Sequence, residues 1–372
     1  MKISFIITST GWGGLEMNTL KLAKSLRTKG FEITLITRVD SSIFLRSSSD
    51  FDSIVLINKS RFKYFNFISS YTIYKALKEF GIGQVMVFDN RDIDVIAWTK
   101  KIFFKSLVVI YQQHMQIGVK KRDLIHSIRF SAIDYWICPL NYLRNEVIEK
   151  TRFAVTKIKV IPIGTEVQKF VKPKLSKEEA RKNLNISSKC LLLGIIGRIS
   201  EKKGQLFVIE SIMKLREKGH NVELLIYGSP TINDPDCQRY YDSICAKIKE
   251  NNLENIVHFI EHKDDTLPFY CATDVFVLAS HGETYGMVTI EAMLTKTPVI
   301  ATRSDATMEM LDHGRNGLLF DYKNHEMFCE KFSLLIKNKM ETERMINRAY
   351  IGAIEKYDHN KEVQEVINIL IR

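Results

Sequence analysis

The chain has 372 residues, of which 45% are hydrophobic and 26% charged. These values are typical of folded globular proteins and exclude a largely disordered chain, and the length is enough for two domains. The formal net charge is +11, and residues 1–170 carry 26 Lys and Arg against 14 Asp and Glu, so the whole basic excess lies in the first half.

The lengths of the apolar runs and the spacing of the cysteines indicate a reducing, cytoplasmic environment. No run approaches the roughly 20 apolar residues that span a bilayer. The first apolar run, 2–8, is too short for a signal-peptide core, so we read it as a strand. The six cysteines are scattered without a Cys-x-x-Cys pair, which argues against a disulfide framework and structural zinc. We expect a cytoplasmic protein.

The basic excess concentrates in three segments in which aromatic residues interleave with cations: 61–65, 100–105 and 120–130. Three interpretations stay open, namely a solvated face, a surface that docks on anionic lipid, and a nucleic-acid site. Because no nucleic-acid-binding motif accompanies the charge, we expect no nucleic-acid partner. An anionic membrane surface remains a candidate partner, with the protein peripheral at the inner face of the membrane.

The first half alternates helical stretches with apolar runs. A helix is predicted at 15–30, ending at a glycine. The runs are apolar throughout, as expected of parallel strands that helices cover on both faces. The predicted strands are 2–8, 31–37, 53–58, 84–89, 106–112 and 134–140.

The alternation of apolar runs and helical stretches stops at 159–179, which we read as an interdomain connection, and resumes after it. The strands predicted after it are 190–197, 222–228, 256–261, 274–280, 298–302 and 317–322. We therefore predict an α/β fold of two Rossmann-like doubly wound domains, 1–165 and 166–356, facing an interdomain cleft. A last helix, at 357–372, has one apolar face and is expected to pack back on the first domain.

A glycine loop joins the first strand to the first helix in TSTGWGGLEMNTLKLA (8–23). Gly13 and Gly14 let the backbone approach a ligand, and the helix N-terminus suits a phosphate. The spacing departs from Gly-x-Gly-x-x-Gly, because Glu16 stands at the last glycine position. A tight turn without ligand is the structural alternative. NADP stays open as a ligand, since Arg38 rather than a carboxylate follows the next strand.

The segment GRISEKKG (197–204) follows the predicted strand at 190–197. Arg198 and Lys203 flank a strand-to-helix loop and could together neutralise a diphosphate. Two solvated surface cations are the alternative.

The segment HGETYGMVTIEAM (281–293) holds two carboxylates eight positions apart. A helix is predicted from Gly286 to Leu294. Glu283 would then lie at the mouth of this helix, where a cap of the helix dipole is the alternative role. Glu291 would lie in its second turn, among apolar neighbours that make an unpartnered carboxylate costly.

Taken together, these motifs resemble the retaining glycosyltransferases of family 4, which have the GT-B fold. HGETYGMVTIEAM resembles their Glu-x7-Glu motif, GRISEKKG their Gly-Arg-x4-Lys-Gly loop, and TGWGGLE their N-terminal glycine loop. IPIGTEVQKF resembles their interdomain segment, although Ile163 and Glu166 replace its usual Asn and Asp. MEMLDHGRNGLLF (308–320) resembles a further family stretch, so that the resemblance spans nearly the whole chain.

The resemblance implies a role for each matching residue. Glu283 would contact donor-sugar hydroxyls, Glu291 would hold the ribose, and Arg198 and Lys203 would stabilise the departing diphosphate. His114 matches a family histidine near the sugar and acceptor; a buried, hydrogen-bonded histidine is the alternative. The remaining donor-binding positions would be Gly13, Gly14, Gly228, Ile260, Tyr285, Gly286 and Met287.

The function that the resemblance implies is transfer of a sugar from a nucleotide-diphosphate sugar to a glycan or lipid-linked acceptor in cell-surface polysaccharide or lipopolysaccharide synthesis. No cofactor and no metal are expected, although Asp92-Ile93-Asp94 has the spacing of a metal-binding pair. The implied chemistry is front-face attack, in which a donor phosphate oxygen takes the acceptor proton. Two alternatives stay open: a nucleotide-sugar epimerase on the same fold, and a non-catalytic peripheral lipid-binding module.

Overall fold

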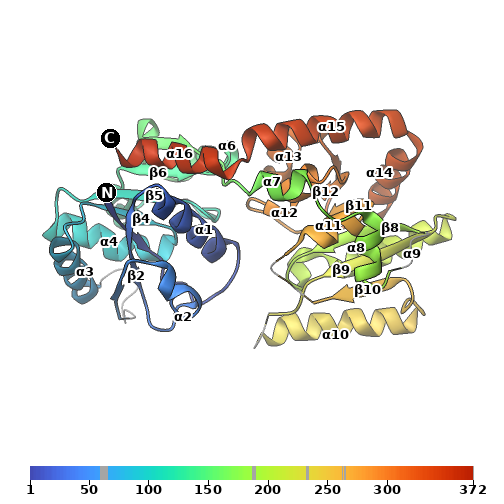
Figure 1. Ribbon diagram of the computed structural model, residues 1–372, viewed down its shortest axis with the longest axis horizontal. Helices are drawn as coiled ribbons and strands as arrows, with labels where there is room; N and C mark the ends of the chain where they lie inside the picture. Colours follow the sequence, from blue (N-terminus) through green and yellow to red (C-terminus); the bar gives the residue numbers. More distant parts are fainter. Residues whose placement is uncertain (59–65, 187–189, 232–233, 262, 264, 372) are drawn as a thin grey trace. The chain divides into compact units, whose positions relative to one another are not determined.

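The computed structural model describes residues 1–58, 66–186, 190–231, 234–261, 263 and 265–371, so the basic segment 61–65 lies outside the described residues. The chain divides into two compact units (Figure 1). The first comprises Met1–Gly164 and His359–Arg372, and the second Thr165–Asp358.

The first unit is built on a seven-stranded parallel sheet in the order β3-β2-β1-β4-β5-β6-β7. The strands are β1 (Lys2–Ile6), β2 (Glu32–Thr37), β3 (Ser53–Leu56), β4 (Gln84–Val87), β5 (Val108–Gln112), β6 (Tyr135–Cys138) and β7 (Ile158–Val160). The helices are α1 (Gly14–Thr28), α2 (Ser42–Ser47), α3 (Phe67–Glu79), α4 (Ile93–Trp98), α5 (Leu124–Phe130), α6 (Asn141–Lys150) and α16 (His359–Leu370). Short turns of helix are η1 (Ser48–Asp50), η2 (Asn90–Asp92), the π-helical η3 (Thr99–Phe103) and η4 (Val155–Lys157).

The last helix, α16, belongs to the first unit. The apolar face of α16 presents Val363, Val366 and Ile369, which share one buried cluster with Ile3 and Phe5 of β1. Burying such a face is what stabilises a single amphipathic helix, and it explains why the chain returns to the first unit.

The second unit has a six-stranded parallel sheet in the order β10-β9-β8-β11-β12-β13. The strands are β8 (Leu191–Ile196), β9 (Val222–Tyr227), β10 (Val257–Ile260), β11 (Val275–Leu278), β12 (Val299–Thr302) and β13 (Leu318–Phe320). The helices are α7 (Val167–Val171), α8 (Lys177–Asn183), α9 (Gln205–Glu217), α10 (Pro235–Glu250), α11 (Leu267–Ala272), α12 (Met287–Leu294), α13 (Asp305–Met310), α14 (His325–Lys337) and α15 (Lys339–Lys356). Two short turns of helix are η5 (Glu201–Lys203) and η6 (Asp312–Gly314).

The predicted fold class, two doubly wound Rossmann-like domains, is confirmed by these sheets. One prediction is wrong in part: 159–179 is not a plain connection. It contains the end of β7, the short helix α7 and the start of α8. A three-residue edge strand and helices of five and seven residues are too short to show a regular spacing of apolar residues in the sequence.

The strand orders locate the ligand-binding edge of each sheet. In open parallel sheets, ligands bind outside the carboxyl ends of the strands, where the strand order reverses. That point lies between β1 and β4 in the first unit and between β8 and β11 in the second.

Candidate functional site

In the second unit, the loops that leave β8 and β11 meet at the reversal point. Lys203 Nζ lies 2.9 Å from Glu283 Oε2. The two loops are also joined through their backbones, since the His281 N–H donates to the Lys202 carbonyl at 2.7 Å. A predicted diphosphate-binding cation and a predicted sugar-binding carboxylate therefore form one ion pair, although 80 positions separate them.

Two helices begin at this edge of the sheet, each after a glycine with positive φ. Gly204 (φ 76°) precedes α9, and Gly286 (φ 79°) precedes α12. A Cβ on Gly204 would lie 2.5 Å from the Ala279 carbonyl oxygen, so only glycine fits where the loop crosses the end of β11. Among the described residues no side chain caps α12, whereas the Tyr240 hydroxyl accepts from the Leu206 N–H in the first turn of α9 at 2.9 Å. The N-terminal amides of α12 and its positive dipole end can therefore bind an anion.

Arg198 adds a second cation to this edge. It follows Gly197 directly after β8, and its side chain is exposed. Gly197 in turn packs against Gly228, where a Cβ would lie only 1.9 Å from the Gly197 carbonyl oxygen. The Gly228 N–H donates to the Ile260 carbonyl at 2.8 Å. The structure thus brings together the two positions predicted for the base pocket, Gly228 directly after β9 and Ile260 at the end of β10.

Glu291 lies in the second turn of α12, as predicted, and is half-buried. Its Oε2 accepts a hydrogen bond from Thr266 Oγ1 at 3.0 Å. Burial, and then the Glu291 carboxylate, raise the pKa of Tyr270 well above its ordinary value. Thr266 orients this carboxylate, and the Tyr270 hydroxyl donates to the Val288 carbonyl of the same helix at 3.0 Å. Nothing in the sequence pattern around Thr266 marks that role.

The backbone predicted to meet the sugar or diphosphate is the turn into α12. Tyr285 is 7% exposed, and its ring centroid lies 6.4 Å from that of Tyr357. Met287, the first residue of α12, is half-buried. The buried tyrosine anchors the turn, so the amides that follow it are held in a fixed direction.

In the first unit, the glycine loop has an internal partner. The Gly13 N–H donates to Glu16 Oε2 at 2.9 Å, and Glu16 is buried. The residue that breaks the glycine spacing therefore places a carboxylate beside the Gly13 amide. Contact of Gly13 and Gly14 with a phosphate stays a prediction, and any such ligand would compete with Glu16 for that amide.

His114 follows β5 at the carboxyl edge of the first sheet. Burial lowers its pKa to about 4, against the opposing influence of Glu362 and Asp89, so the imidazole is neutral near pH 7. Its Nε2 atom is buried without a hydrogen-bond partner among the described residues. The alternative of a hydrogen-bonded core histidine therefore does not account for this nitrogen, which can bond to a ligand.

Asp92 and Asp94 both make contacts inside the first unit. Asp92 accepts hydrogen bonds from the backbone N–H and the hydroxyl of Thr8 at 2.9 and 2.5 Å, and Asp94 pairs with the buried Arg129. Burial, with Asp89 as a second cause, raises the pKa of Asp92 to about 7. Within the described ranges, no group of three or more His, Cys, Asp or Glu side chains could hold a metal ion.

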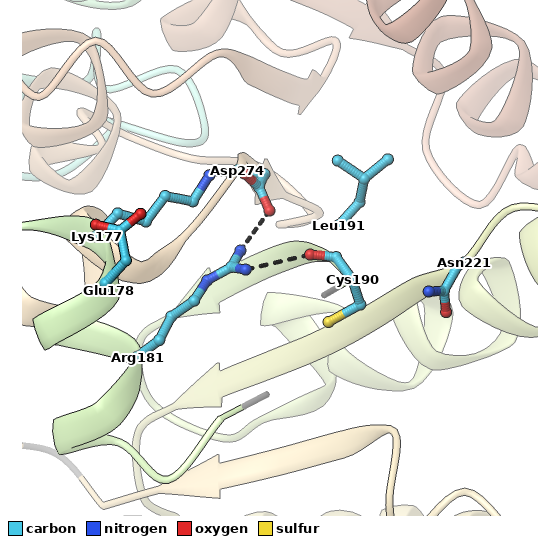
Figure 2. A pocket seen from close by; sticks show the side chains of 7 residues that line it. All are labelled: Lys177, Glu178, Arg181, Cys190, Leu191, Asn221 and Asp274. Carbon is cyan, nitrogen blue, oxygen red and sulfur yellow. Dashed lines mark hydrogen bonds and ion pairs between the residues drawn. The ribbon is translucent and has the colours of Figure 1, made fainter. Parts of the chain in front are cut away.

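A pocket of about 370 Å³ lies at the opposite edge of the second sheet (Figure 2). Arg181 of α8 is buried there, and it donates to the carbonyls of Ala272 and Cys190 at 2.9 and 3.2 Å. It also pairs with Asp274, which bonds Lys177 as well. Figure 2 shows the Arg181 guanidinium directed at Asp274 and at the Cys190 carbonyl. We interpret this cluster as a clamp that fastens α8 to the amino ends of the strands.

The predicted site residues therefore form two groups. Arg198, Lys203, Gly228, Ile260, Glu283, Tyr285, Gly286, Met287 and Glu291 belong to the second unit, and Gly13, Gly14 and His114 to the first. That both groups serve a single site stays a prediction.

Residues 176–351, which lie within the second unit, match the family model described as "Glycosyl transferases group 1". The chain is similar to an uncharacterized glycosyltransferase, MJ1607, of Methanocaldococcus jannaschii, with 27% identity over 61% of this chain and 57% of the relative. It is also similar to the capsular polysaccharide biosynthesis glycosyltransferase CapM of Staphylococcus aureus, with 30% identity over 53% of this chain and 50% of the relative. The chain thus spans about half the length of the curated relatives it matches.

Among solved structures, the chain is similar to HepE of Anabaena in complex with UDP. The TM-score is 0.85 and the identity 19%, over 100% of this chain and 99% of HepE. At this identity the likeness shows the fold alone, and that fold is GT-B.

Proposed function

We propose that the protein is a retaining glycosyltransferase of family 4 that moves a sugar from a nucleotide-diphosphate sugar to a glycan or lipid-linked acceptor. The observation that carries this proposal is the meeting of Lys203 and Glu283 at the carboxyl edge between β8 and β11. One side chain of the pair can bind a diphosphate and the other a sugar hydroxyl, and the N-terminus of α12, which no described side chain caps, starts beside them.

Charge at the leaving group explains how this site would accelerate transfer. Breaking the bond between the sugar C1 and the phosphate oxygen leaves negative charge on the diphosphate and positive character on the sugar. Lys203, Arg198 and the amides at the start of α12 would stabilise the diphosphate, and fixed donors aimed at developing charge lower such a barrier strongly. Since these cations can neutralise the diphosphate, we propose that the reaction requires neither a metal nor a cofactor.

The proposal also assigns residues to donor binding and accounts for retention of configuration at the sugar C1. Glu291 would hold the ribose hydroxyls while Gly228 and Ile260 line the base pocket. The acceptor oxygen would attack C1 on the face that the diphosphate leaves, and a phosphate oxygen of the leaving group would take its proton, so the configuration is retained. His114, neutral and with an unpartnered Nε2, would bond to a hydroxyl of the sugar or acceptor.

Relatives support the substrate classes. HepE has been solved in complex with UDP-glucose, which supports a nucleotide-sugar donor. The similarity to CapM and to the lipopolysaccharide core biosynthesis glycosyltransferase LpsE of Rhizobium meliloti supports a role in cell-surface polysaccharide or lipopolysaccharide synthesis. None of the helices in the described ranges is both long and apolar enough to cross a membrane. We propose a cytoplasmic protein that acts peripherally on the inner face of an anionic membrane.

The test is to incubate the protein with UDP-, GDP- and ADP-sugars, with and without EDTA, and to measure nucleotide release and thermal stabilisation. We expect one nucleotide class to stabilise the protein and to be released equally well in EDTA. If none of the donors binds, the proposal fails, and if EDTA abolishes turnover, its metal-independent part fails.

A further inference from the structure

Helix α5 of the first unit carries an apolar stripe on its outer face. Leu124, Ile125 and Ile128 are 72%, 46% and 36% exposed, and at 3.6 residues per turn they fall within an arc of about 100°. Val119, in the preceding loop, is 75% exposed. The opposite side of the helix is anchored, because Phe130 is buried in the core. Exposed apolar side chains gathered on one face mark an interaction surface rather than ordinary surface scatter.

A pocket of about 200 Å³ opens beside this stripe and has the composition of an anion site. Its lining includes Arg152 and Lys157, and no carboxylate is among its described lining residues. Ser131 also lines it, and its hydroxyl accepts a hydrogen bond from Lys101 Nζ at 2.8 Å. Phe130 and Phe153 supply apolar wall. Three cations around an apolar-walled pocket match a phosphate that is attached to a hydrocarbon group.

The chain before α5 adds charge of the same sign. Lys120 and Arg122 are exposed between Val119 and the helix. The carboxylate of Asp123 caps the helix, accepting from the His126 N–H at 3.0 Å, so it is engaged locally. Cations beside exposed aliphatic side chains suit the headgroup boundary of an anionic bilayer. A nucleic acid would leave the aliphatic stripe without a partner.

We infer that α5 and its flanking loops form a lipid-docking site: Val119, Leu124, Ile125 and Ile128 enter the headgroup boundary of an anionic bilayer while Arg152 and Lys157 bind a lipid phosphate in the adjacent pocket. This inference rests on the membrane part of the proposed function and gives it a location in the first unit. It does not depend on the donor or on the transfer reaction.

The test is binding of the full chain to vesicles of phosphatidylcholine alone and of phosphatidylcholine with 30% phosphatidylglycerol, measured by flotation. We expect the wild type to bind only the anionic vesicles, and less strongly as salt is raised. The double variant Arg152→Gln/Lys157→Gln should bind about 30-fold more weakly, because each basic side chain near an anionic surface contributes about a factor of five. Leu124→Ser/Ile128→Ser should bind at least about tenfold more weakly, since both side chains would leave the headgroup boundary.

Two variants of the second unit serve as matched controls. Lys337→Gln/Lys339→Gln removes the same charge, and Ile351→Ser removes an aliphatic side chain that is 54% exposed. Both should bind vesicles as the wild type does, and thermal unfolding of every variant checks that it folds.

Each negative result of the vesicle-binding experiment contradicts a different part of the account. If the α5 variants and the controls weaken binding equally, the docking site is wrong while membrane binding stands. If the wild type binds no anionic vesicle, the docking site and the membrane part of the proposed function fail together, whereas nucleotide release tests the donor chemistry separately. If Leu124→Ser/Ile128→Ser instead abolishes a self-association of the chain, the surface belongs to a second copy and the inference is overturned.

Discussion

At the scale of single residues, the ion pair between Lys203 and Glu283 organises the candidate site. Each side chain is less than a third exposed, so their interaction is less screened than that of a surface pair. A bound donor would insert a diphosphate beside Lys203 and a sugar beside Glu283, and the pair would keep both side chains in place before it arrives. Such preorganisation is what makes fixed charges effective in catalysis.

Arg198→Ala should separate rate from binding. The exposed Arg198 is proposed to act on charge that develops on the leaving diphosphate, so kcat should fall by roughly 100-fold, with a much smaller change in donor affinity. Steady-state kinetics together with direct donor binding measure the two effects. Lys202→Ala, which removes an exposed neighbouring cation, is the control and should change neither. An unchanged kcat in Arg198→Ala would remove Arg198 from the catalytic role.

Asp92→Asn should alter the pH dependence of stability. The folded protein keeps the Asp92 proton up to about pH 7, whereas the unfolded chain releases it near pH 4. The folded state therefore binds more protons between these values, and its stability falls as pH rises through that window, by up to about 4 kcal/mol. Asparagine stays neutral, so this contribution to the fall should be absent in the variant.

The measurement for Asp92 is the free energy of unfolding from pH 4.5 to pH 8 in wild type and variant. Asp40→Asn, which changes a half-exposed carboxylate of the same unit, should keep the slope of the wild type. Parallel curves for wild type and Asp92→Asn would show that Asp92 titrates normally.

Local sequence patterns identify the side chains of the candidate site, but not the residues that those side chains contact. Arg198, Lys203, Glu283 and Glu291 could be selected from local spacing, because each lies in a loop or in the first two turns of a helix that follows an apolar strand. The Lys203–Glu283 contact could not be derived, since it depends on how two distant loops pack. Likewise, no local pattern identifies Thr266 as the partner of Glu291: an N-terminal threonine of a short helix looks the same whether or not it faces a carboxylate.

At the scale of elements, the apolar pattern locates the strands but overestimates their length. The run 274–280 is predicted as a strand, whereas β11 is Val275–Leu278. Ala279 and Ser280 are still buried, because the chain remains inside the unit after it leaves the ladder. Hydrophobicity reports burial rather than strand pairing, so the ends of buried strands cannot be read from it.

Helix α8 depends on one buried side chain. Arg181→Ala would remove the donor to two carbonyls and leave Asp274 partly unpaired in a buried setting. Removing one partner of a buried pair destabilises proteins by about 3 kcal/mol or more. The midpoint of urea unfolding of the full chain should fall accordingly.

Lys177→Ala is the matched control for this clamp, because Lys177 bonds the same Asp274 from a side chain that is 45% exposed. Its loss should cost less than about 1 kcal/mol. Equal effects of the two substitutions would mean that Arg181 contributes no more than a surface ion pair does.

At the scale of the whole molecule, the basic excess and the family match fall in different halves of the chain. The basic excess lies in residues 1–170, and the family model matches 176–351. The fold class was predictable because twelve apolar runs separated by helical stretches permit few architectures other than two parallel sheets. β7 was missed because its three residues are too few to carry a pattern.

The central claim is that a nucleotide-sugar donor binds at the carboxyl edge of the second sheet. Its most direct test is a measurement of equilibrium donor affinity in wild type, Glu291→Ala and Lys177→Ala. The donor used is the one that the release assay selects. We predict that Glu291→Ala binds at least about tenfold more weakly, since it loses the acceptor of charge-assisted hydrogen bonds from the ribose hydroxyls. Lys177→Ala, in the pocket at the opposite edge of the sheet, should bind as the wild type does. Unchanged affinity in Glu291→Ala together with weakened affinity in Lys177→Ala would contradict the claim and move the donor to the other edge.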